Sequence, residues 1–361
     1  MIGIRESTTH YEKWLSSQIQ VVKPDLVFKH QQMSASPFMF MRATFYRWMQ
    51  LWTTECKEAA RAPALLAVGD LHIENFGTWR DSEGRLIWGV NDFDEAYTLP
   101  YTIDLIRLAA SAHLAIRAEH LSVRRREACD AILEGYLEGI RSGGRPFVLD
   151  EKHPFLRAVA LGKLRDPASY WAKMRRNANV SEKVSSDAQE ALELFLPNKK
   201  LPFIVKRRRA GLGSLGRQRF VALADWQGGP IAREIKSALP SACTLCGPPA
   251  ANETPNYSKI IAKAVRVPDP FVRLHGNWIV RRLAPDCSRV ELSALPQKRD
   301  EFRLLHSMGF ETANIHLGSE EIIPKVRTDL NKRSPLWLHE AAKAMVKAVQ
   351  SDWEEWRKPK K

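Results

Sequence analysis

The chain has 361 residues, a formal net charge of +14 and 44% hydrophobic residues, as expected for a globular protein with two domains or lobes. It has no apolar run of roughly eighteen residues, so a membrane-spanning helix is not expected. The first residues lack the apolar core of a signal peptide, and five cysteines are too few for a disulfide scaffold. We therefore expect a cytoplasmic protein.

The excess of Lys and Arg favours anionic partners, such as nucleotide phosphates, an acidic substrate, nucleic acid or a lipid surface. Each basic cluster is equally well explained as a solvated face of a basic protein. Net charge is the only feature that indicates nucleic acid, so charge alone does not decide between these partners.

Helical patterns dominate the first two hundred residues. Apolar residues at helical spacing predict helices over residues 7–62, 103–117, 122–141 and 154–196. Ser36-Pro37 breaks the first of these, since proline suits the first turn of a new helix. Apolar runs at 65–68 and 85–90 predict two short buried strands that each end in a polar loop.

Strand patterns replace helical ones from about residue 201. Strands are predicted over 203–205, 219–224, 231–235 and 277–283, a helix over 257–267, and further helices from about 298 to the end. The fold class is therefore α+β. We divide the chain into an N-terminal helical segment (1–65), the first part of a helical lobe (66–200), a β-rich lobe (201–290) and the C-terminal part of the helical lobe (291–361).

The loop after the strand at 65–68 contains the first chemical motif, Gly69-Asp70-Leu71-His72-Ile73-Glu74-Asn75. Asn75 follows Asp70 by five positions, as in kinase catalytic loops, where the aspartate faces the substrate hydroxyl and the asparagine holds a metal ion. In isolation, an aspartate that caps a turn explains the motif equally well. We interpret His72 as a hydrogen-bonding support for the loop.

The loop after the strand at 85–90 contains two carboxylates, Asp92 and Asp94. Carboxylate oxygens at a strand end are ligands that Mg²⁺ prefers. An exposed acidic turn is the alternative, but the apolar strand before them favours an inward position. The sequence therefore predicts a magnesium site formed by Asn75, Asp92 and Asp94.

A glycine turn between two predicted strands contains Gly211, Gly213, Ser214 and Gly216, and Lys236 lies on the following strand. A strand, glycine turn, strand and lysine in this order are typical of the glycine flap and phosphate-binding lysine of kinases. These residues are candidates for binding ATP. An ordinary edge-strand lysine is the alternative for Lys236.

These motifs resemble those of the aminoglycoside-phosphotransferase and choline-kinase branch of protein-kinase-like folds. More closely, the chain resembles the uncharacterised bacterial family catalogued as domain of unknown function 2252. The matching segments are Met33–Arg42, Gly69–Gly77, Asn91–Glu95, Asp104–Ala109, Gly211–Gly216 and Lys236–Ser241.

The resemblance implies Asp70 as catalytic base, Asn75 and Asp92 as magnesium ligands, and Lys236 as a phosphate contact. It also implies that Asp104 is a buried aspartate that braces the catalytic loop. No helical glutamate partner for Lys236 is evident, and Glu253 is only a loose candidate.

The order of the motifs is permuted, because in kinases the glycine flap and lysine precede the catalytic loop. The predicted fold is thus a circularly permuted, two-lobed kinase-like fold with a split helical lobe. We expect ATP- and Mg²⁺-dependent phosphoryl transfer to a hydroxyl group. Since only ten residues separate Asp94 from Asp104, no long activation loop fits, which favours a small-molecule acceptor. The alternatives are nucleotidyl transfer to a protein, a non-catalytic pseudokinase and a nucleic-acid-binding module.

Overall fold

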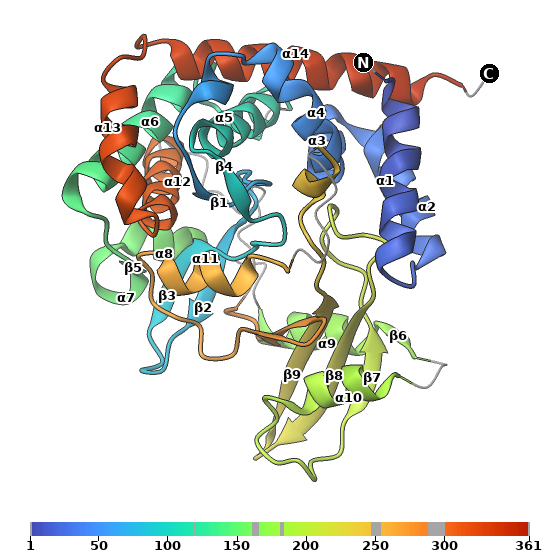
Figure 1. The fold of residues 1–361 in the computed structure, drawn as a ribbon. Coiled ribbons are helices and arrows are strands. Elements are labelled where there is room, and N and C mark those ends of the chain that lie inside the picture. The colour runs from blue at the N-terminus through green and yellow to red at the C-terminus, as the bar shows by residue number, and fades with distance from the viewer. Residues whose placement is uncertain are drawn as a thin grey trace.

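The computed structural model describes residues 2–118, 120–160, 166–180, 184–246, 254–287 and 300–359. Helices form one region of the molecule, and an antiparallel sheet with two covering helices forms the other, at the bottom of Figure 1. The helices predicted over residues 7–62 are confirmed as α1 (Ile4–Gln18), α2 (Lys23–Ala35), α3 (Pro37–Ala43) and α4 (Phe45–Glu55). Ser36 caps α3 by accepting a hydrogen bond from the Met39 amide at 3.2 Å.

The helical region is built around α5 (Thr102–Arg117), which is buried along almost its whole length. The helices that pack against it include α3, α6 (Arg125–Ser142), α12 (Asp300–His316) and α14 (Trp337–Arg357). The short elements η1 (Ala59–Arg61), η5 (Glu320–Ile322) and α13 (Ile323–Leu330) complete this region. Its buried apolar residues form one continuous cluster, so a single core holds segments from both ends of the chain.

The two chain ends lie side by side, because α1 and α14 pack together (Figure 1). Arg5 Nη2 donates to the Trp356 carbonyl at 2.7 Å, and Arg47 forms a buried ion pair with Asp352 at 2.6 Å. Adjacent ends are the geometry in which a circular permutation is tolerated.

Two small sheets lie in the helical region. β1 (Ala64–Ala67) pairs with β4 (Tyr97–Pro100), and β3 (Leu86–Val90) pairs with β2 (Phe76–Arg80) and β5 (Phe147–Val148), all antiparallel. β1 and β3 confirm the two predicted strands, whereas β2 and β4 were not predicted. The short helices α7 (Leu149–Lys152) and α8 (Pro154–Ala160) follow β5. The polar loops after β1 and β3 emerge beside the core.

The second region contains a six-stranded antiparallel sheet in the order β10-β11-β9-β8-β7-β6. The strands are β6 (Ala178–Asn179), β7 (Ile204–Arg207), β8 (Arg219–Trp226), β9 (Gly229–Ser237), β10 (Arg273–His275) and β11 (Trp278–Leu283). The described strands all pair antiparallel, and sheets of this kind combined with helices define an α+β fold. The remaining elements, η3 (Ala242–Cys246) and α11 (Tyr257–Lys263), connect β9 to β10.

Two helices cover opposite faces of this sheet. α9 (Pro167–Arg175) packs on the face that includes Val221, and α10 (Ser186–Glu193) packs on the face that includes Ala222. Neighbouring residues of a strand point to opposite faces, so the helices enclose the sheet. The packing therefore extends this region to about residue 167, beyond the predicted 201–290.

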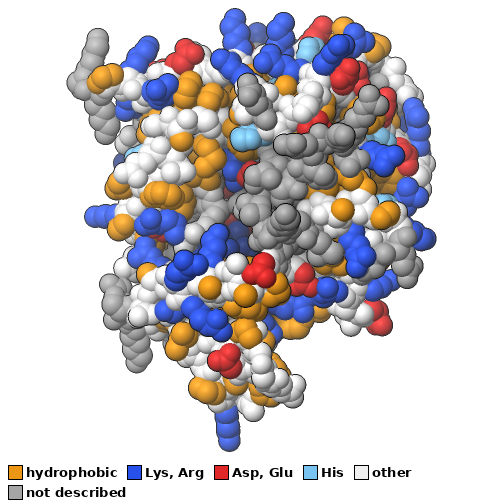
Figure 2. Space-filling model, turned by 180° about the vertical axis from the view of Figure 1, so that it is seen from behind, with side chains coloured by type: hydrophobic (Ala, Val, Ile, Leu, Met, Phe, Trp, Pro, Cys, Tyr) orange, Lys and Arg blue, Asp and Glu red, His pale blue; other side chains and the backbone are white. Residues whose placement is uncertain are grey.

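Basic side chains are spread over the described part of the face shown in Figure 2. They are interspersed there with Asp, Glu and apolar side chains. None of the described helices combines the length and apolar character needed to cross a bilayer.

Candidate functional site

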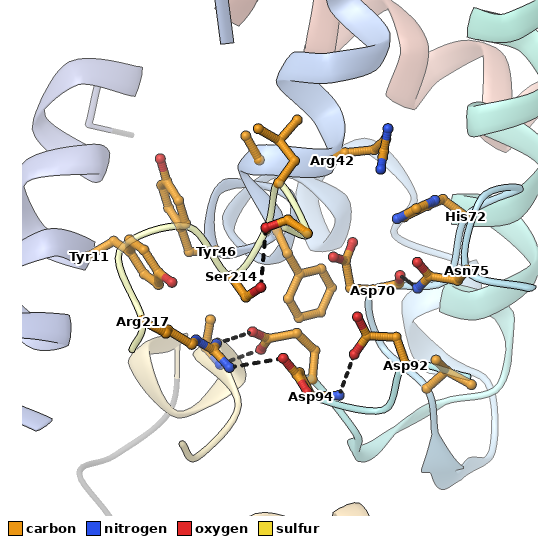
Figure 3. Close-up of a pocket in the computed structure, with 18 residues that line it drawn as sticks. Tyr11, Arg42, Tyr46, Asp70, His72, Asn75, Asp92, Asp94, Ser214 and Arg217 are labelled. Carbon is orange, nitrogen blue, oxygen red and sulfur yellow. Dashed lines mark hydrogen bonds and ion pairs between the residues drawn. The ribbon is translucent and has the colours of Figure 1, made fainter. Parts of the chain in front are cut away.

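One pocket collects most of the predicted site residues. Its walls include Asp70, Asn75, Asp92 and Asp94 from the helical region, and the turn residues Gly211, Gly213 and Ser214. In Figure 3, the three labelled side chains of Asp70, Asn75 and Asp92 lie together, facing Ser214 and Arg217 across the pocket. Lys236 reaches this group from β9 through Asp94, whereas Gly216 does not line the pocket.

Asp104 holds the backbone of the first polar loop. Its two carboxylate oxygens accept hydrogen bonds from the amides of Val68 at 2.7 Å and Gly69 at 2.8 Å. Gly69 has φ +82°, and a Cβ there would lie 2.4 Å from the Glu95 carbonyl oxygen, so only glycine fits this turn. Asp104 is fully buried, and its contacts are those expected of a loop brace.

α12 supports both polar loops from behind. His316 lies 2.9 Å from the Asp104 carboxylate through Nε2. Glu311 accepts a hydrogen bond from the Val90 amide at 3.2 Å, at the end of β3. Burial raises the pKa of Glu311 to about 7, against the lowering effect of Arg266. One helix thus fixes the starts of the loops that carry Asp70 and Asp92.

The Asp70 carboxylate is anchored by Arg107, a contact that sequence reasoning missed. Arg107 Nε donates to Asp70 Oδ1 at 2.7 Å, and Arg107 Nη2 donates to the same oxygen. Arg107 is fully buried, and its guanidinium carbon lies 5.1 Å from the centroid of the Phe45 ring and 4.8 Å from that of Trp48. The sequence offered one clue to this contact: Arg107 lies three residues after Asp104, so the two side chains lie on the same side of one helix.

Anchoring through Oδ1 leaves Asp70 Oδ2 facing the glycine turn, where a Cβ on Gly213 would lie 3.4 Å away. Burial raises the pKa of Asp70 to about 7, although the Arg107 charge opposes this rise. A carboxylate with a pKa near neutrality is able to accept and release a proton at physiological pH.

Asn75 and His72 shape the same loop. Asn75 Nδ2 donates to the Asp70 carbonyl at 2.5 Å, which leaves its amide oxygen as the atom for a metal ion. His72 Nδ1 accepts from the Glu74 amide at 3.2 Å, a contact of the supporting kind predicted for it. Glu74 in turn pairs with Arg42 at 2.6 Å.

Asp92 and Asp94 differ in their surroundings. The Asp92 side chain is 39% exposed and lies 3.6 Å from the Lys236 ammonium group. Asp94 is nearly buried, with Oδ1 2.5 Å from Lys236 and Oδ2 3.2 Å from Arg217. Asp94 is therefore committed to two cations, and Asp92 is the more available metal ligand.

The charges on Lys236 and Arg281 determine the protonation state of Asp92. The surrounding protein raises the pKa of this carboxyl by desolvation, but the positive charges of Lys236 and Arg281 outweigh it and hold the pKa below its ordinary value. Lys236 has carboxylate partners here in place of a helical glutamate, and Glu253 lies outside the described residues.

Arg217 and Glu95 close the pocket on the far side. Sequence reasoning included Glu95 only as the end of the acidic motif and missed Arg217. Arg217 Nη2 donates to Glu95 Oε1 at 3.1 Å, and Glu95 Oε2 accepts from the Ala242 amide at 2.6 Å. Both residues lie directly beside predicted site residues in the sequence, since Arg217 follows Gly216 and Glu95 follows Asp94, and this position could have indicated them.

The glycine turn is packed into the helical core rather than exposed as a free flap. Leu212 and Leu215 are buried within the large apolar cluster, and Lys29 Nζ donates to the Gly213 carbonyl at 3.2 Å. Burial lowers the pKa of Lys29 to about 8. The turn therefore lies over Asp70, with strands β7 and β8 on either side as predicted.

A buried ion cluster connects the turn to the sheet. Glu234 on β9 is fully buried and pairs with Arg219 at 2.8 Å, Arg281 at 2.7 Å, and Arg208. Arg219 Nη2 also donates to Ser214 Oγ at 2.9 Å. Three guanidinium groups around one carboxylate leave an excess of positive charge beside the pocket.

The donor set fits Mg²⁺, because Asp92 and Asn75 offer hard oxygen ligands at adjacent loop ends. The pocket volume is about 40 Å³, far below the roughly 300 Å³ that a small-molecule site needs. The pocket in this conformation is therefore too small to hold a nucleotide.

The fold and site together define an α+β protein with a buried cluster of carboxylates, arginines and one lysine. Residues 22–197 match the family model described as an uncharacterized protein conserved in bacteria (DUF2252), the family that the motifs resemble. The matched range contains Asp70, Asn75, Asp92 and Asp104 but ends before the glycine turn and Lys236. No curated protein and no solved structure matches the chain.

Proposed function

We propose that this protein has a permuted kinase-like fold and transfers the γ-phosphoryl group of ATP, with Mg²⁺, to a hydroxyl group of a small molecule. The main support is the convergence of three sequence segments on one pocket. Asp70 and Asp92 line it from two loops of the helical region, and the glycine turn supplies the third segment. Lys236 on β9 does not line the pocket itself, but its ammonium group lies 3.6 Å from Asp92. A base, a metal ligand and a phosphate-binding cation are the parts that phosphoryl transfer requires.

Asp70 acts in this proposal as the base. Its Oδ1 is held by Arg107, so Oδ2 orients the acceptor hydroxyl and accepts its proton as the new bond to phosphorus forms. With a pKa of about 7, the carboxylate form increases as the pH rises through neutrality. Turnover is therefore expected to rise with pH across that range.

Asp92 and Asn75 would hold Mg²⁺, and Lys236 would turn from Asp92 and Asp94 toward the phosphates. When bound, ATP would supply the phosphoryl group, and Mg²⁺ would neutralise the negative charge that develops during transfer. The arginines around Glu234 keep positive charge close to the glycine turn through the contact of Arg219 with Ser214.

The position of α12 supports the permuted arrangement. This helix, from the C-terminal part of the chain, contacts β1 and β3 and holds both site loops through His316 and Glu311. In sequence, residues 302–316 resemble the helix that leads into a kinase catalytic loop. The adjacent chain ends are compatible with such a rearrangement.

The experiment is a coupled assay for ADP formation with ATP, Mg²⁺ and pools of hydroxyl-bearing metabolites. Once an acceptor is found, Asp70→Asn is expected to lower turnover by about 10²–10⁴-fold, because the amide has no basic oxygen. Asp225→Asn is the matched control, since Asp225 is exposed on β8. Asp70→Asn also leaves the buried Arg107 without its counter-charge. The melting temperatures of both variants show whether this loss destabilises the fold.

Nucleotide binding is measured separately by thermal shift. ATP with Mg²⁺ is expected to stabilise the wild type by about 2.7 kcal/mol at a hundredfold excess over its dissociation constant. Asp92→Asn should remove the Mg²⁺-dependent part of this shift. A wild-type chain that no nucleotide stabilises and that forms no ADP contradicts the proposal, and binding without turnover favours a pseudokinase.

A further inference from the structure

Three potential metal ligands meet where α5, α6 and α14 pack together, among residues that do not line the pocket described above. They are His113 on α5, Cys129 on α6 and His339 on α14. One ligand atom from each residue lies within 4.8 Å of the other two. Since these residues lie far apart in the sequence, no sequence motif indicates the cluster.

The pairwise geometry is close to that of a zinc site. His113 Nε2 lies 3.2 Å from Cys129 Sγ, and the two imidazole rings are 5.3 Å apart between centroids. Zinc bonds of about 2.3 Å to sulfur and 2.0–2.1 Å to nitrogen at a tetrahedral angle place these two atoms about 3.5 Å apart. Small side-chain adjustments therefore suffice to bring the three atoms around one ion.

A buried imidazole nitrogen with no hydrogen-bond partner in the described part of the chain also indicates a bound metal ion at this cluster. His339 Nδ1 is buried and has no hydrogen-bond partner among the described residues, which is a costly arrangement for an imidazole nitrogen. His113 Nε2 lies 3.1 Å from the Arg125 carbonyl, so binding of zinc at this nitrogen requires that hydrogen bond to break and the ring proton to lie on Nδ1. His113 and Cys129 are each 2% exposed, whereas His339 is partly exposed and offers an entry path.

We propose that His113, Cys129 and His339 bind one Zn²⁺ ion that links the three helices. One thiolate and two imidazoles form a ligand set suited to zinc, and water completes the tetrahedral set. The thiol proton of Cys129 leaves to solvent as the sulfur–zinc bond forms. The ion thereby cross-links α14 to the buried helix α5.

The test uses Co²⁺ in place of Zn²⁺, because a cobalt–thiolate bond produces a near-ultraviolet charge-transfer band. The purified full-length chain is freed of metal with a chelator and titrated with Co²⁺, and the band is expected to saturate at one ion per chain. Cys129→Ala should abolish it. Cys56→Ala is the matched control, since Cys56 is also buried and its Sγ contacts the Ala341 carbonyl of α14 at 3.7 Å.

Zinc affinity is measured by competition with a chromophoric chelator. His339→Ala should weaken binding by at least roughly 10- to 100-fold, and this partly exposed position carries the lowest risk of unfolding. Zn²⁺ should raise the melting temperature of the wild type but not of this variant. Absence of the cobalt band in the wild type, or its persistence in Cys129→Ala, overturns the proposal. The carboxylates of the pocket give no thiolate band, so the result is independent of the proposed function.

Discussion

The helical region and the six-stranded sheet region stabilise buried carboxylates in different ways. In the helical region, Asp104 is held by two backbone amides and one histidine inside a continuous apolar core. In the sheet region, Glu234 is held by three arginine side chains, between two small apolar clusters on opposite faces.

This difference assigns different properties to the two sides of the pocket. Backbone amides cannot change partners without unfolding a loop, so Asp70 and Asp92 start from fixed positions. Arginine and lysine side chains can change partners by rotating, so Lys236 and Arg219 are able to adapt to an anion. The comparison predicts a fixed acidic side and an adaptable basic side.

The largest effect is expected from removing the centre of the arginine cluster. Glu234→Gln keeps the shape but leaves three guanidinium groups without a buried counter-charge, which should cost about 3–5 kcal/mol of unfolding free energy. Chemical denaturation measures the loss, and Asp225→Asn on the neighbouring strand is the control, expected to stay within about 0.5 kcal/mol. An equally small loss in Glu234→Gln would mean that the arginines are stabilised by solvent rather than by Glu234.

A smaller effect is expected from the corresponding change in the helical region. Asp104→Asn retains one acceptor oxygen but loses the charge and one amide contact, so it should cost about 1.5–3 kcal/mol. Because the loop that carries Asp70 then loses its anchor, hydrogen exchange at the amides of Val68 and Gly69 should become faster. Unchanged protection of these amides would show that β1, and not Asp104, fixes the loop.

Local patterns allowed much of the fold to be predicted. The helices of the N-terminal segment and the strands β1 and β3 have uniform apolar patterns, so their prediction was confirmed. β2 and β4 have mixed sequences, and the pairing of β4 with β1 joins segments about thirty residues apart. Strands of this kind are defined by their partners, which no local pattern contains.

The candidate site was predicted as a set of motifs but not as a network. Spacing around Asp70 and Asp92 indicated that they belong together, and both line the pocket. The pairing of Asp70 with Arg107 was not visible, because an arginine within an apolar helix is usually expected to reach solvent. The burial of Leu212 within a glycine turn was not visible either, since a flexible flap was the simpler interpretation.

The smallest effect is expected at the contact between the two sides. A Cβ on Gly213 would lie 3.2 Å from the Arg42 carbonyl oxygen and 3.4 Å from Asp70 Oδ2, so Gly213→Ala strains the packed turn. At Gly229 a Cβ meets nothing within 4 Å, so Gly229→Ala is the matched control, with a gain of about 0.4–1 kcal/mol from reduced chain entropy. Gly213→Ala should instead lose about 1 kcal/mol of unfolding free energy by overpacking.

The same variant tests whether the turn must lift before a nucleotide binds. In that case the strain destabilises the packed conformation but not the lifted one, so ATP should bind a few-fold more tightly to Gly213→Ala than to the wild type. Denaturation and nucleotide titration of both variants measure the two effects. A Gly213→Ala variant that matches Gly229→Ala in stability would show that the turn does not press on Asp70. Loss of stability with weaker ATP binding would mean that the turn holds the nucleotide in its packed position.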